Sequence, residues 1–264
     1  MSTDARQAMY PVAPARLPQL HRWAMSLVGL GLVVLLGNAA WHSLKESSFF
    51  LVTNVDVSGT LDYTDRTALM ARVGQYTEQS LLTLDIEAVQ RQVEEMPWVR
   101  HAHVGRSAPG RLTIRIEEHE PIARWNDHSL ISKRQILFAP PQLKADNSEY
   151  AEWRSHFKSL PVLGGSDARH EAVLDDYRQY SQALATVNVR LRSLIEDERQ
   201  SQVLTLDNNI VVRLGYEDRS LRMRRFIDVY ERLVVPLNGQ SAQFDMRYTN
   251  GFAYSGAPAY LDGN

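Results

Sequence analysis

The chain has 264 residues, with 29 lysines and arginines against 31 aspartates and glutamates, a formal net charge of -2. This balance argues against the basic surface that nucleic-acid binding requires, so nucleic acid is not an expected partner. The chain contains no cysteine, which excludes disulfides, thiolate metal sites and cysteine nucleophiles.

A long apolar segment, residues 23–41, carries no charged side chain and begins and ends with tryptophan. As a helix it would be roughly 28 Å long, close to the hydrocarbon thickness of a bilayer. Tryptophan is enriched at both membrane interfaces, and charged residues flank the segment on either side. We therefore expect a transmembrane helix over residues 23–44.

The preceding tail, residues 1–22, contains three arginines and one aspartate. The positive-inside rule places this tail in the cytoplasm and roughly 220 residues on the far side of the membrane, in the periplasm or at the cell surface. A cleaved signal peptide is the alternative, because small residues at positions 37 and 39 suit a cleavage site. The length of the apolar run and its flanking tryptophans favour an uncleaved span.

The residues after the span begin with one predicted strand and two short helices. The strand covers residues 50–59, where β-branched side chains alternate with polar ones. Thr64 is the expected N-cap of the first helix, and Gly74 ends it. Asp85 is the expected N-cap of the second helix, which ends before Pro97.

Two further strands complete this unit. Residues 99–106 predict one strand, and residues 110–117 alternate apolar and polar side chains without a break. The sequence Ser-Ala-Pro-Gly at 107–110 supplies the turn between them. The predicted order is therefore strand, helix, helix, strand, strand.

Three local motifs accompany this order of elements: Val-x-Gly at 57–59, Met-Pro-Trp-Val at 96–99 and Glu-x-x-Pro-Ile-Ala-Arg-Trp at 118–125. The order, directly after a single membrane span, resembles a POTRA domain, and the motifs are similar to those of the FtsQ/DivIB family of bacterial cell division proteins. The resemblance continues more thinly through Leu-Pro-Val-Leu at 160–163 and Asp-Met-Arg-Tyr at 245–248. It covers about four-fifths of the chain.

The resemblance implies an α+β fold, with a single transmembrane helix followed by a POTRA domain (β-α-α-β-β) and a second β-rich domain with packed helices. The POTRA domain would cover residues 50–120, the β domain residues 121–256 and a C-terminal tail residues 257–264. Because a POTRA unit alone does not specify a function, the residues of the second domain need their own interpretation.

The second domain shows both strand and helix patterns. Residues 130–138 predict a hairpin of short strands, and residues 160–163 another short strand. Apolar residues at helical spacing predict the next helix, with Asp167 as its expected cap. Two strands at 202–207 and 210–215 are joined by two asparagines, which tolerate the positive φ of a tight turn.

A last helix is expected to begin at Asp218 and to turn its apolar residues toward the core. Its arginines would then lie largely outside, where a cluster can recognise acidic peptides or lipid headgroups. A solvated helix face is the more common explanation of such a run. The arginines are Arg219, Arg222, Arg224, Arg225 and Arg232.

The chain is expected to close with a hairpin. Phe244, Met246 and Tyr248 share one face of its first strand, and the Asn-Gly pair at 250–251 is a strong signal for a two-residue turn. The final strand, residues 252–255, has no later strand to pair with. We expect an open edge that offers backbone donors and acceptors to another chain. The alternative is an edge covered by an internal strand or by the C-terminal residues.

The family resemblance also implies a function, namely a non-enzymatic scaffold of the divisome. Such a protein links early and late division proteins at the septum, as a single-pass protein of the inner membrane with a cytoplasmic N-terminus and its bulk in the periplasm. The first domain would engage earlier partners such as FtsK. The second would bind FtsB, held with FtsL, and so help control septal peptidoglycan synthesis by FtsW and FtsI. FtsN is a further expected partner.

The family binds FtsB by β-addition onto the final strand, so the resemblance also implies the residues that make this contact. Arg199, just before a predicted strand, is an expected carboxylate partner on the same surface. Some relatives carry a tryptophan where this chain has Gly256, and Tyr254 or Phe252 would replace that anchor. The remaining expected residues are Arg247, Tyr248, Gly251, Phe252, Ala253, Tyr254 and Ser255.

Catalytic and metal-binding patterns are sparse, so we expect no enzyme activity, cofactor, metal or small-molecule substrate. His101 and His103 face one way on a strand, as a metal pair can, although most such pairs are merely exposed. The acidic run at 117–120 suits acid–base work, but the resemblance gives Glu118 a structural role between the domains. Two alternatives belong to other classes: a POTRA-containing periplasmic transport or assembly factor for outer-membrane proteins, and a cell-wall hydrolase.

Overall fold

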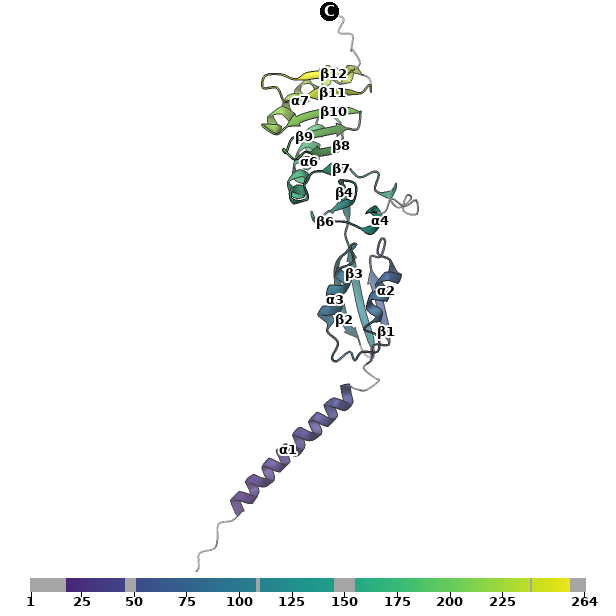
Figure 1. Ribbon diagram of the computed structural model, residues 1–264, viewed down its shortest axis with the longest axis vertical. Helices are drawn as coiled ribbons and strands as arrows, with labels where there is room; N and C mark the ends of the chain where they lie inside the picture. The colour runs from purple at the N-terminus through teal and green to yellow at the C-terminus, as the bar shows by residue number, and fades with distance from the viewer. Residues whose placement is uncertain (1–17, 46–50, 108–109, 145–154, 238, 257–264) are drawn as a thin grey trace, which may run out of the picture.

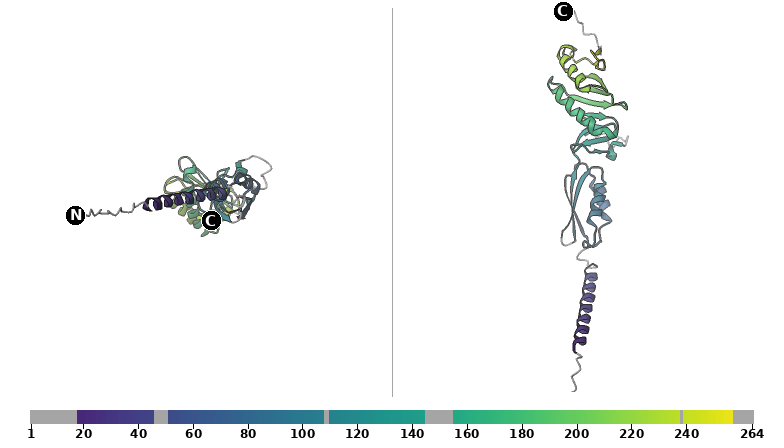
Figure 2. Two further views of the ribbon diagram at one scale, coloured as in Figure 1. Left: turned by 90° about the horizontal axis from the view of Figure 1, so that it is seen from below. Right: turned by 90° about the vertical axis from the view of Figure 1, so that its left-hand side faces the viewer.

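The computed structural model describes residues 18–45, 51–107, 110–144, 155–237 and 239–256. The chain is elongated, and its N-terminal helix, a small α/β unit and a larger sheet follow one another along the long axis (Figure 1). The last strand lies at the end farthest from the N-terminal helix, and Figure 2 shows the same order from the side. The predicted α+β fold class is confirmed.

The N-terminal helix α1 (Pro18–Lys45) is longer than the predicted span and begins at a proline, a residue favoured in the first turn of a helix. The flanking tryptophans are exposed, Trp23 by 73% and Trp41 by 54%. The segment Met25–Ser43 within α1 is long and apolar enough to cross a membrane. The helix fits a single-pass membrane protein, as the composition predicted.

The small unit has the predicted order of strand, helix, helix, strand and strand. Its central strand β3 runs parallel to β1 and antiparallel to β2. The first strand begins at residue 54 rather than at 50. The elements are β1 (Asn54–Gly59), α2 (Arg66–Gly74), α3 (Ile86–Glu94), β2 (Val99–Ser107) and β3 (Arg111–Glu118).

The buried carboxylate of Glu118 fixes the loop that leads into α2. It accepts hydrogen bonds from the backbone N–H groups of Asp62 at 2.9 Å, Tyr63 at 3.2 Å and Thr64 at 2.6 Å. Asp65 is the N-cap of α2, accepting from the Thr67 N–H at 2.7 Å, so the prediction of Thr64 as the cap was wrong. Glu118 thus serves structure, because its oxygens hold a backbone turn.

The larger sheet has nine strands within the described residues, in the order β12-β11-β10-β9-β8-β7-β4-β5-β6. Neighbouring strands are parallel in β4–β7, β7–β8 and β10–β11, and the other pairs are antiparallel. The strands are β4 (Pro121–Trp125), β5 (Ser129–Ser132), β6 (Leu137–Phe138), β7 (Val162–Gly164), β8 (Leu191–Glu196), β9 (Gln202–Leu206), β10 (Ile210–Gly215), β11 (Ala242–Asp245) and β12 (Ala253–Gly256).

Two long helices, α6 (His170–Ala185) and α7 (Arg219–Leu233), pack on one face of this sheet. Every second residue of β9 is fully buried, which is the pattern of a sheet covered on one face. Phe226 of α7 and Tyr180 of α6 lie in the same apolar core as the strands. The short helical segments are α4 (Pro141–Lys144), η3 (Asp167–Arg169) and η4 (Val235–Leu237).

Asp167 does not cap a helix as the sequence suggested. Its carboxylate accepts the indole N–H of the buried Trp125 at 2.7 Å, and η3 carries no side-chain cap at its start. A buried indole N–H needs an acceptor, so this contact determines where the carboxylate points. The prediction of Asp167 as a cap was therefore wrong.

A buried carboxylate, Glu196, ties α6, α7 and the sheet together. Its side chain is 1% exposed and accepts hydrogen bonds from Arg169, from Arg219 at 3.2 Å and from Gln202 at 3.0 Å. Burial alone would raise the pKa of Glu196, but the hydrogen bonds and the two positive charges outweigh burial and lower it. The network stays charged and fixes the ends of three elements.

An aromatic cluster joins the small unit to the larger sheet. Trp98, just before β2, stacks on Tyr63 with ring centroids 4.4 Å apart, and it contacts Phe138 of β6 at 5.1 Å and Phe157 at 5.9 Å. His119 stacks on Phe138 at 4.6 Å, and its burial, together with the charge of Arg100, lowers the pKa of its imidazole. The two units therefore share a packed apolar junction.

Candidate binding edge at β12

Among the residues that the structure describes, the final strand β12 is one edge of the nine-stranded sheet and pairs with β11 alone. All four of its residues are exposed. The other edge, β6, is two residues long, and its Phe138 is buried in the aromatic junction. Alternate N–H and C=O groups of β12 are therefore directed to the side that β11 does not occupy.

The edge strands of the small unit differ from β12 in charge. Asp56 of β1 pairs with Arg111 at 2.7 Å, and β2 carries Arg100, His101, His103 and Arg106. Charged side chains on an edge strand discourage pairing with another chain. Strand β12 consists of Ala, Tyr, Ser and Gly, so its edge lacks this protection.

The connection from β11 to β12 is not the two-residue turn that the Asn-Gly pair predicted. Strand β11 ends at Asp245, directly opposite Ala253, so residues 246–252 form a longer loop. Neither residue of the pair at 250–251 has the positive φ that a tight hairpin turn needs. The prediction of a common face also fails for Tyr248, which is 59% exposed while Met246 and Phe244 are buried.

A single guanidinium from α7 holds this loop. Arg225 donates to the carbonyl oxygens of Tyr248 at 3.0 Å, Thr249 at 3.0 Å and Gly251 at 3.2 Å. Three carbonyls that converge on one cation impose a loop shape that a two-residue turn cannot supply. Arg225 therefore positions the residues that lead into β12.

The prediction that the arginines of α7 lie largely outside was correct for Arg224 and Arg232 and wrong for the other three. Arg219 contacts Glu196 and Asp176, and Arg222 donates to the carbonyl of Leu214 at 2.7 Å. Together with Arg225, these residues recur every third position and lie on one side of α7. The guanidinium groups of these three arginines bind acceptors within the protein, so the cluster is not a free basic surface.

We expect Arg225→Gln to loosen β12 while leaving the core intact. The loss of charge-assisted hydrogen bonds at a partly exposed site should cost about 1–2 kcal/mol of local stability, so amide hydrogen exchange at 253–256 should be about tenfold faster. Arg224→Gln, an exposed neighbour on the same helix, is the matched control and should change nothing. Unchanged exchange at β12 in the Arg225 variant would show that the guanidinium does not hold the loop.

Aromatic side chains anchor β12 to the core on the α7 face. Phe244 of β11 is fully buried and contacts Phe226 of α7 with centroids 5.4 Å apart. Tyr254 lies opposite Phe244 with ring centroids 5.1 Å apart, and Phe252 also packs on Phe244, at a centroid distance of 6.0 Å. Tyr254 remains 39% exposed, so one side of its ring is accessible beside the open edge.

Arg247 is held by a short ion pair beside the loop. Its guanidinium donates to both carboxylate oxygens of Asp245, at 2.8 Å and 2.6 Å. Hydrogen bonding to Arg247 lowers the pKa of Asp245 and raises that of Arg247 itself. The aliphatic part of Arg247 lies over Gly215, where a Cβ atom would come within 2.9 Å of Arg247 Cγ. The pair therefore fixes the start of the loop and leaves the guanidinium partly exposed.

Arg199 lies farther from the edge than the other expected residues. It sits in the exposed turn between β8 and β9, and its backbone N–H donates to Asp197 at 2.9 Å. The turn and the start of β12 are at the same end of the sheet, but β9 and β12 are three strand spacings apart, about 14 Å. A partner would have to extend across β10 and β11 to reach both.

The histidine pair on β2 has an ordinary structural role. His101 Nδ1 lies 2.7 Å from a carboxylate oxygen of Glu94, and His103 is exposed on the same face. In the part of the chain that the structure describes, no group of three histidines, aspartates or glutamates is placed to hold a metal ion.

Two family models match this chain. Residues 50–119 match the model described as POTRA domain, FtsQ-type, and residues 123–247 match that described as Cell division protein FtsQ/DivIB, C-terminal. The second match ends just before Tyr248, so the loop and β12 lie beyond it.

Curated relatives support the same family over nearly the whole chain. The Cell division protein FtsQ of Haemophilus influenzae is 30% identical and covers 85% of each chain, and that of Actinobacillus pleuropneumoniae is 31% identical over 83% of this chain and 92% of its own. The protein of the same name from Neisseria gonorrhoeae is 27% identical over 92% of this chain and 93% of its own.

Proposed function

The chain belongs to the FtsQ/DivIB family of cell division proteins, and we propose that it is a non-enzymatic divisome scaffold that binds a partner chain at β12 by strand addition. The observation that carries this proposal is the uncharged, exposed edge strand at the end of the sheet. An added strand would pair with its open backbone groups and extend the sheet.

The proposed partner is FtsB, held together with FtsL. The family resemblance supports this choice, because strand addition of FtsB onto the last strand is the family's binding mode. Through this contact the protein would help control septal peptidoglycan synthesis by FtsW and FtsI. FtsK would engage the first unit, and FtsN is a further proposed partner.

The proposed topology follows from the span and the charge of the tail. Residues 1–22 would lie in the cytoplasm, α1 would cross the inner membrane, and the two folded units would lie in the periplasm at the septum. The elongated shape in Figure 1 supports this arrangement, since β12 lies at the end farthest from α1. Partner binding would thus take place away from the bilayer surface.

Backbone hydrogen bonds and aromatic side chains would both contribute to binding of the partner strand. Alternate residues of β12, whose N–H and C=O groups are directed away from β11, would supply the hydrogen bonds of the added strand. The exposed rings of Tyr248 and Tyr254, with Phe252 packed on Phe244 nearby, would supply the apolar contacts, since aromatic side chains that become buried dominate many interfaces. Gly251 lies in the loop that Arg225 holds in place before the strand.

Acidic partner residues would meet two arginines at this end of the sheet. Arg247 keeps an exposed guanidinium beside the loop, and Arg199 lies across the sheet from it. A partner that pairs with β12 and then crosses the sheet end would reach both. Exposed contacts of this kind contribute modestly, so the backbone edge carries most of the proposed affinity.

The test is a titration of the full-length chain in lipid nanodiscs with the periplasmic segment of FtsB. We expect Tyr248→Ala to weaken binding about tenfold, because an exposed ring would become buried in the complex. Tyr248→Phe keeps the ring and should stay within about threefold of the wild type. Equal affinity of all three proteins would show that Tyr248 does not contribute to the interface. Hydrolysis of purified peptidoglycan by the chain would contradict the non-enzymatic role.

A further inference from the structure

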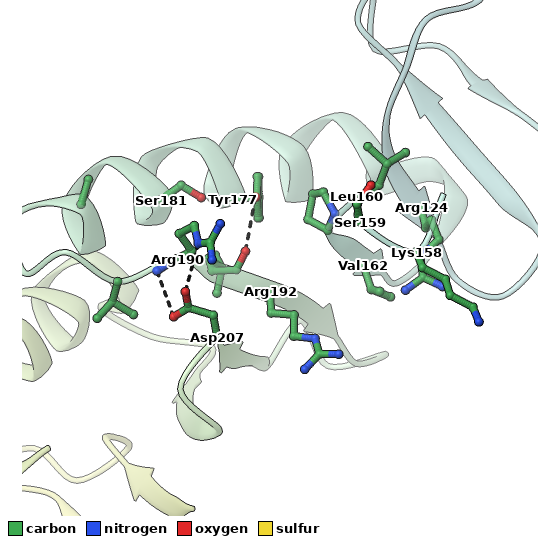
Figure 3. A pocket seen from close by; sticks show the side chains of 14 residues that line it. Arg124, Lys158, Ser159, Leu160, Val162, Tyr177, Ser181, Arg190, Arg192 and Asp207 are labelled. Atoms are coloured by element: carbon green, nitrogen blue, oxygen red, sulfur yellow. Dashed lines mark hydrogen bonds and ion pairs between the residues drawn. The ribbon is translucent and has the colours of Figure 1, made fainter. Parts of the chain in front are cut away.

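A second feature of the larger sheet is a cavity of about 520 Å³ far from β12. It lies between the C-terminal half of α6, the loop at 158–161 and the starts of β7 and β8 (Figure 3). Its volume falls in the range of sites that bind small ligands or peptide side chains. Arg192 on this wall is four strand spacings from β12, about 19 Å, so the cavity is separate from the proposed FtsB edge.

The cavity wall is strongly positive. Arg124, Lys158, Arg190 and Arg192 line it, against one carboxylate, Asp207. Arg190 is already paired with Asp207 at 3.0 Å, as the dashed line in Figure 3 marks. Arg124, Lys158 and Arg192 have no ion-pair partner among the residues that the structure describes. Within the described part of the chain, three cations therefore face or flank the same space without a counter-charge.

Two buried polar atoms in the wall also lack partners. Arg124 Nε and Ser181 Oγ are inaccessible to solvent and have no hydrogen-bond partner within the described part of the chain. Both can donate, and a buried donor without an acceptor costs free energy. Tyr177, between them in Figure 3, already donates to the carbonyl of Leu191 at 3.4 Å. Because these two atoms are buried behind the wall, what the cavity itself offers to an acceptor is the positive charge of its lining residues.

The rest of the cavity wall is apolar, and this apolar surface favours anions that also carry an aliphatic group. Leu160, Pro161, Val162 and Val189 provide aliphatic surface beside the cations. A free inorganic anion would leave this surface exposed to water, whereas an acidic side chain with an aliphatic neighbour would cover it. Charge and shape together favour a peptide that carries carboxylates.

We propose that this cavity binds an acidic peptide segment of a partner chain, with a carboxylate among Arg124, Lys158 and Arg192 and an adjacent aliphatic side chain against the apolar wall. Carboxylates and guanidinium groups form charge-assisted hydrogen bonds, which are stronger than neutral ones. The segment would bind independently of the strand at β12. The scaffold would then hold two partner segments at once.

The absence of cysteine from the sequence allows a direct test. Ala185→Cys, at the exposed end of α6 on the cavity rim, is labelled with an environment-sensitive fluorophore in the full-length chain in nanodiscs. The probes are the blocked pentapeptide Glu-Leu-Glu-Leu-Glu, its glutamine counterpart Gln-Leu-Gln-Leu-Gln, and inorganic phosphate. We expect saturable binding of the acidic peptide, at least about tenfold tighter than either other probe and weaker at high salt.

Variants of the cavity wall distinguish specific binding in the cavity from non-specific electrostatic attraction of the acidic peptide. Arg192→Gln and Lys158→Gln should each weaken binding of the acidic peptide about five- to tenfold. Arg178→Gln removes the same charge from an exposed position of α6 outside the cavity and should leave binding unchanged. No saturation up to about 5 mM peptide, equal binding of the glutamine peptide, tighter binding of phosphate, or an equal loss in the Arg178 variant would each overturn the proposal.

Discussion

Proline in β12 is expected to abolish measurable strand addition, lowering affinity for the FtsB segment by at least about thirtyfold. Two adjacent positions are needed, Tyr254→Pro and Ser255→Pro, because neighbouring residues of a strand direct their N–H groups to opposite sides. One variant therefore loses a hydrogen bond to the incoming strand, and the other loses one to β11. Proline also places its ring where the ladder would form.

The controls retain the N–H group and the β propensity. Tyr254→Val and Ser255→Val change the side chains without removing a donor, so they should bind far better than their proline counterparts. The proline variant with the outward N–H should melt within a few degrees of the wild type, because its pairing with β11 is intact. Wild-type affinity in that stable variant would mean that the partner does not pair with β12.

Trp98→Ala is expected to cause the largest loss of stability, about 3–5 kcal/mol. The ring lies 3% exposed in the junction between the small unit and the larger sheet, against Tyr63, Phe138 and Phe157. Its removal would leave a cavity where the two units meet. We therefore expect calorimetry of the full-length chain to show two separated transitions, with the small unit unfolding at the lower temperature.

The matched control for this variant is Tyr216→Ala, which removes an aromatic ring from an exposed position. It should change the free energy of unfolding by less than about 0.5 kcal/mol. A loss below about 1 kcal/mol for Trp98→Ala, with a single transition retained, would contradict the junction as a packed core.

The sequence patterns predicted the small unit well because its contacts are mostly between elements with clear periodicity. The strand at 110–117 alternates strictly, and β3 occupies Arg111–Glu118. Asp85 is the N-cap of α3 as expected, accepting from Ala88 at 3.0 Å. Local signals were sufficient there because each acts over only a few residues.

Two strands of the larger sheet were missed for identifiable reasons. Strand β4 begins at Pro121, which looks like a break although proline is tolerated as the first residue of a strand. Strand β8 has a register shift between Leu191 and Ser193, so its buried residues do not alternate regularly. A test for period-two alternation fails on such a strand.

The terminal loop shows the limit of local signals most clearly. The Asn-Gly pair predicts a two-residue turn, but the side chain of Arg225, distant in sequence, collects three carbonyls of that loop instead. A final strand near residues 252–255 was nevertheless predicted, and β12 (Ala253–Gly256) is an edge of the sheet within the described residues. Which arginines of α7 are used internally depends on the folded neighbours and cannot be predicted from their spacing alone.

The most direct test of strand addition uses cysteine pairs, since the chain contains none of its own. Single cysteines at 253–256, and control cysteines in β1 and β2, are each combined with single cysteines along the FtsB segment and oxidised. Residues directly opposite in paired strands lie within disulfide reach. We predict that the cross-linked pairs follow one strand register, so that moving the cysteine by one residue along β12 moves its cross-linked partner in FtsB by one residue. Cross-links from β1 or β2, with none from β12, would contradict the proposed binding edge.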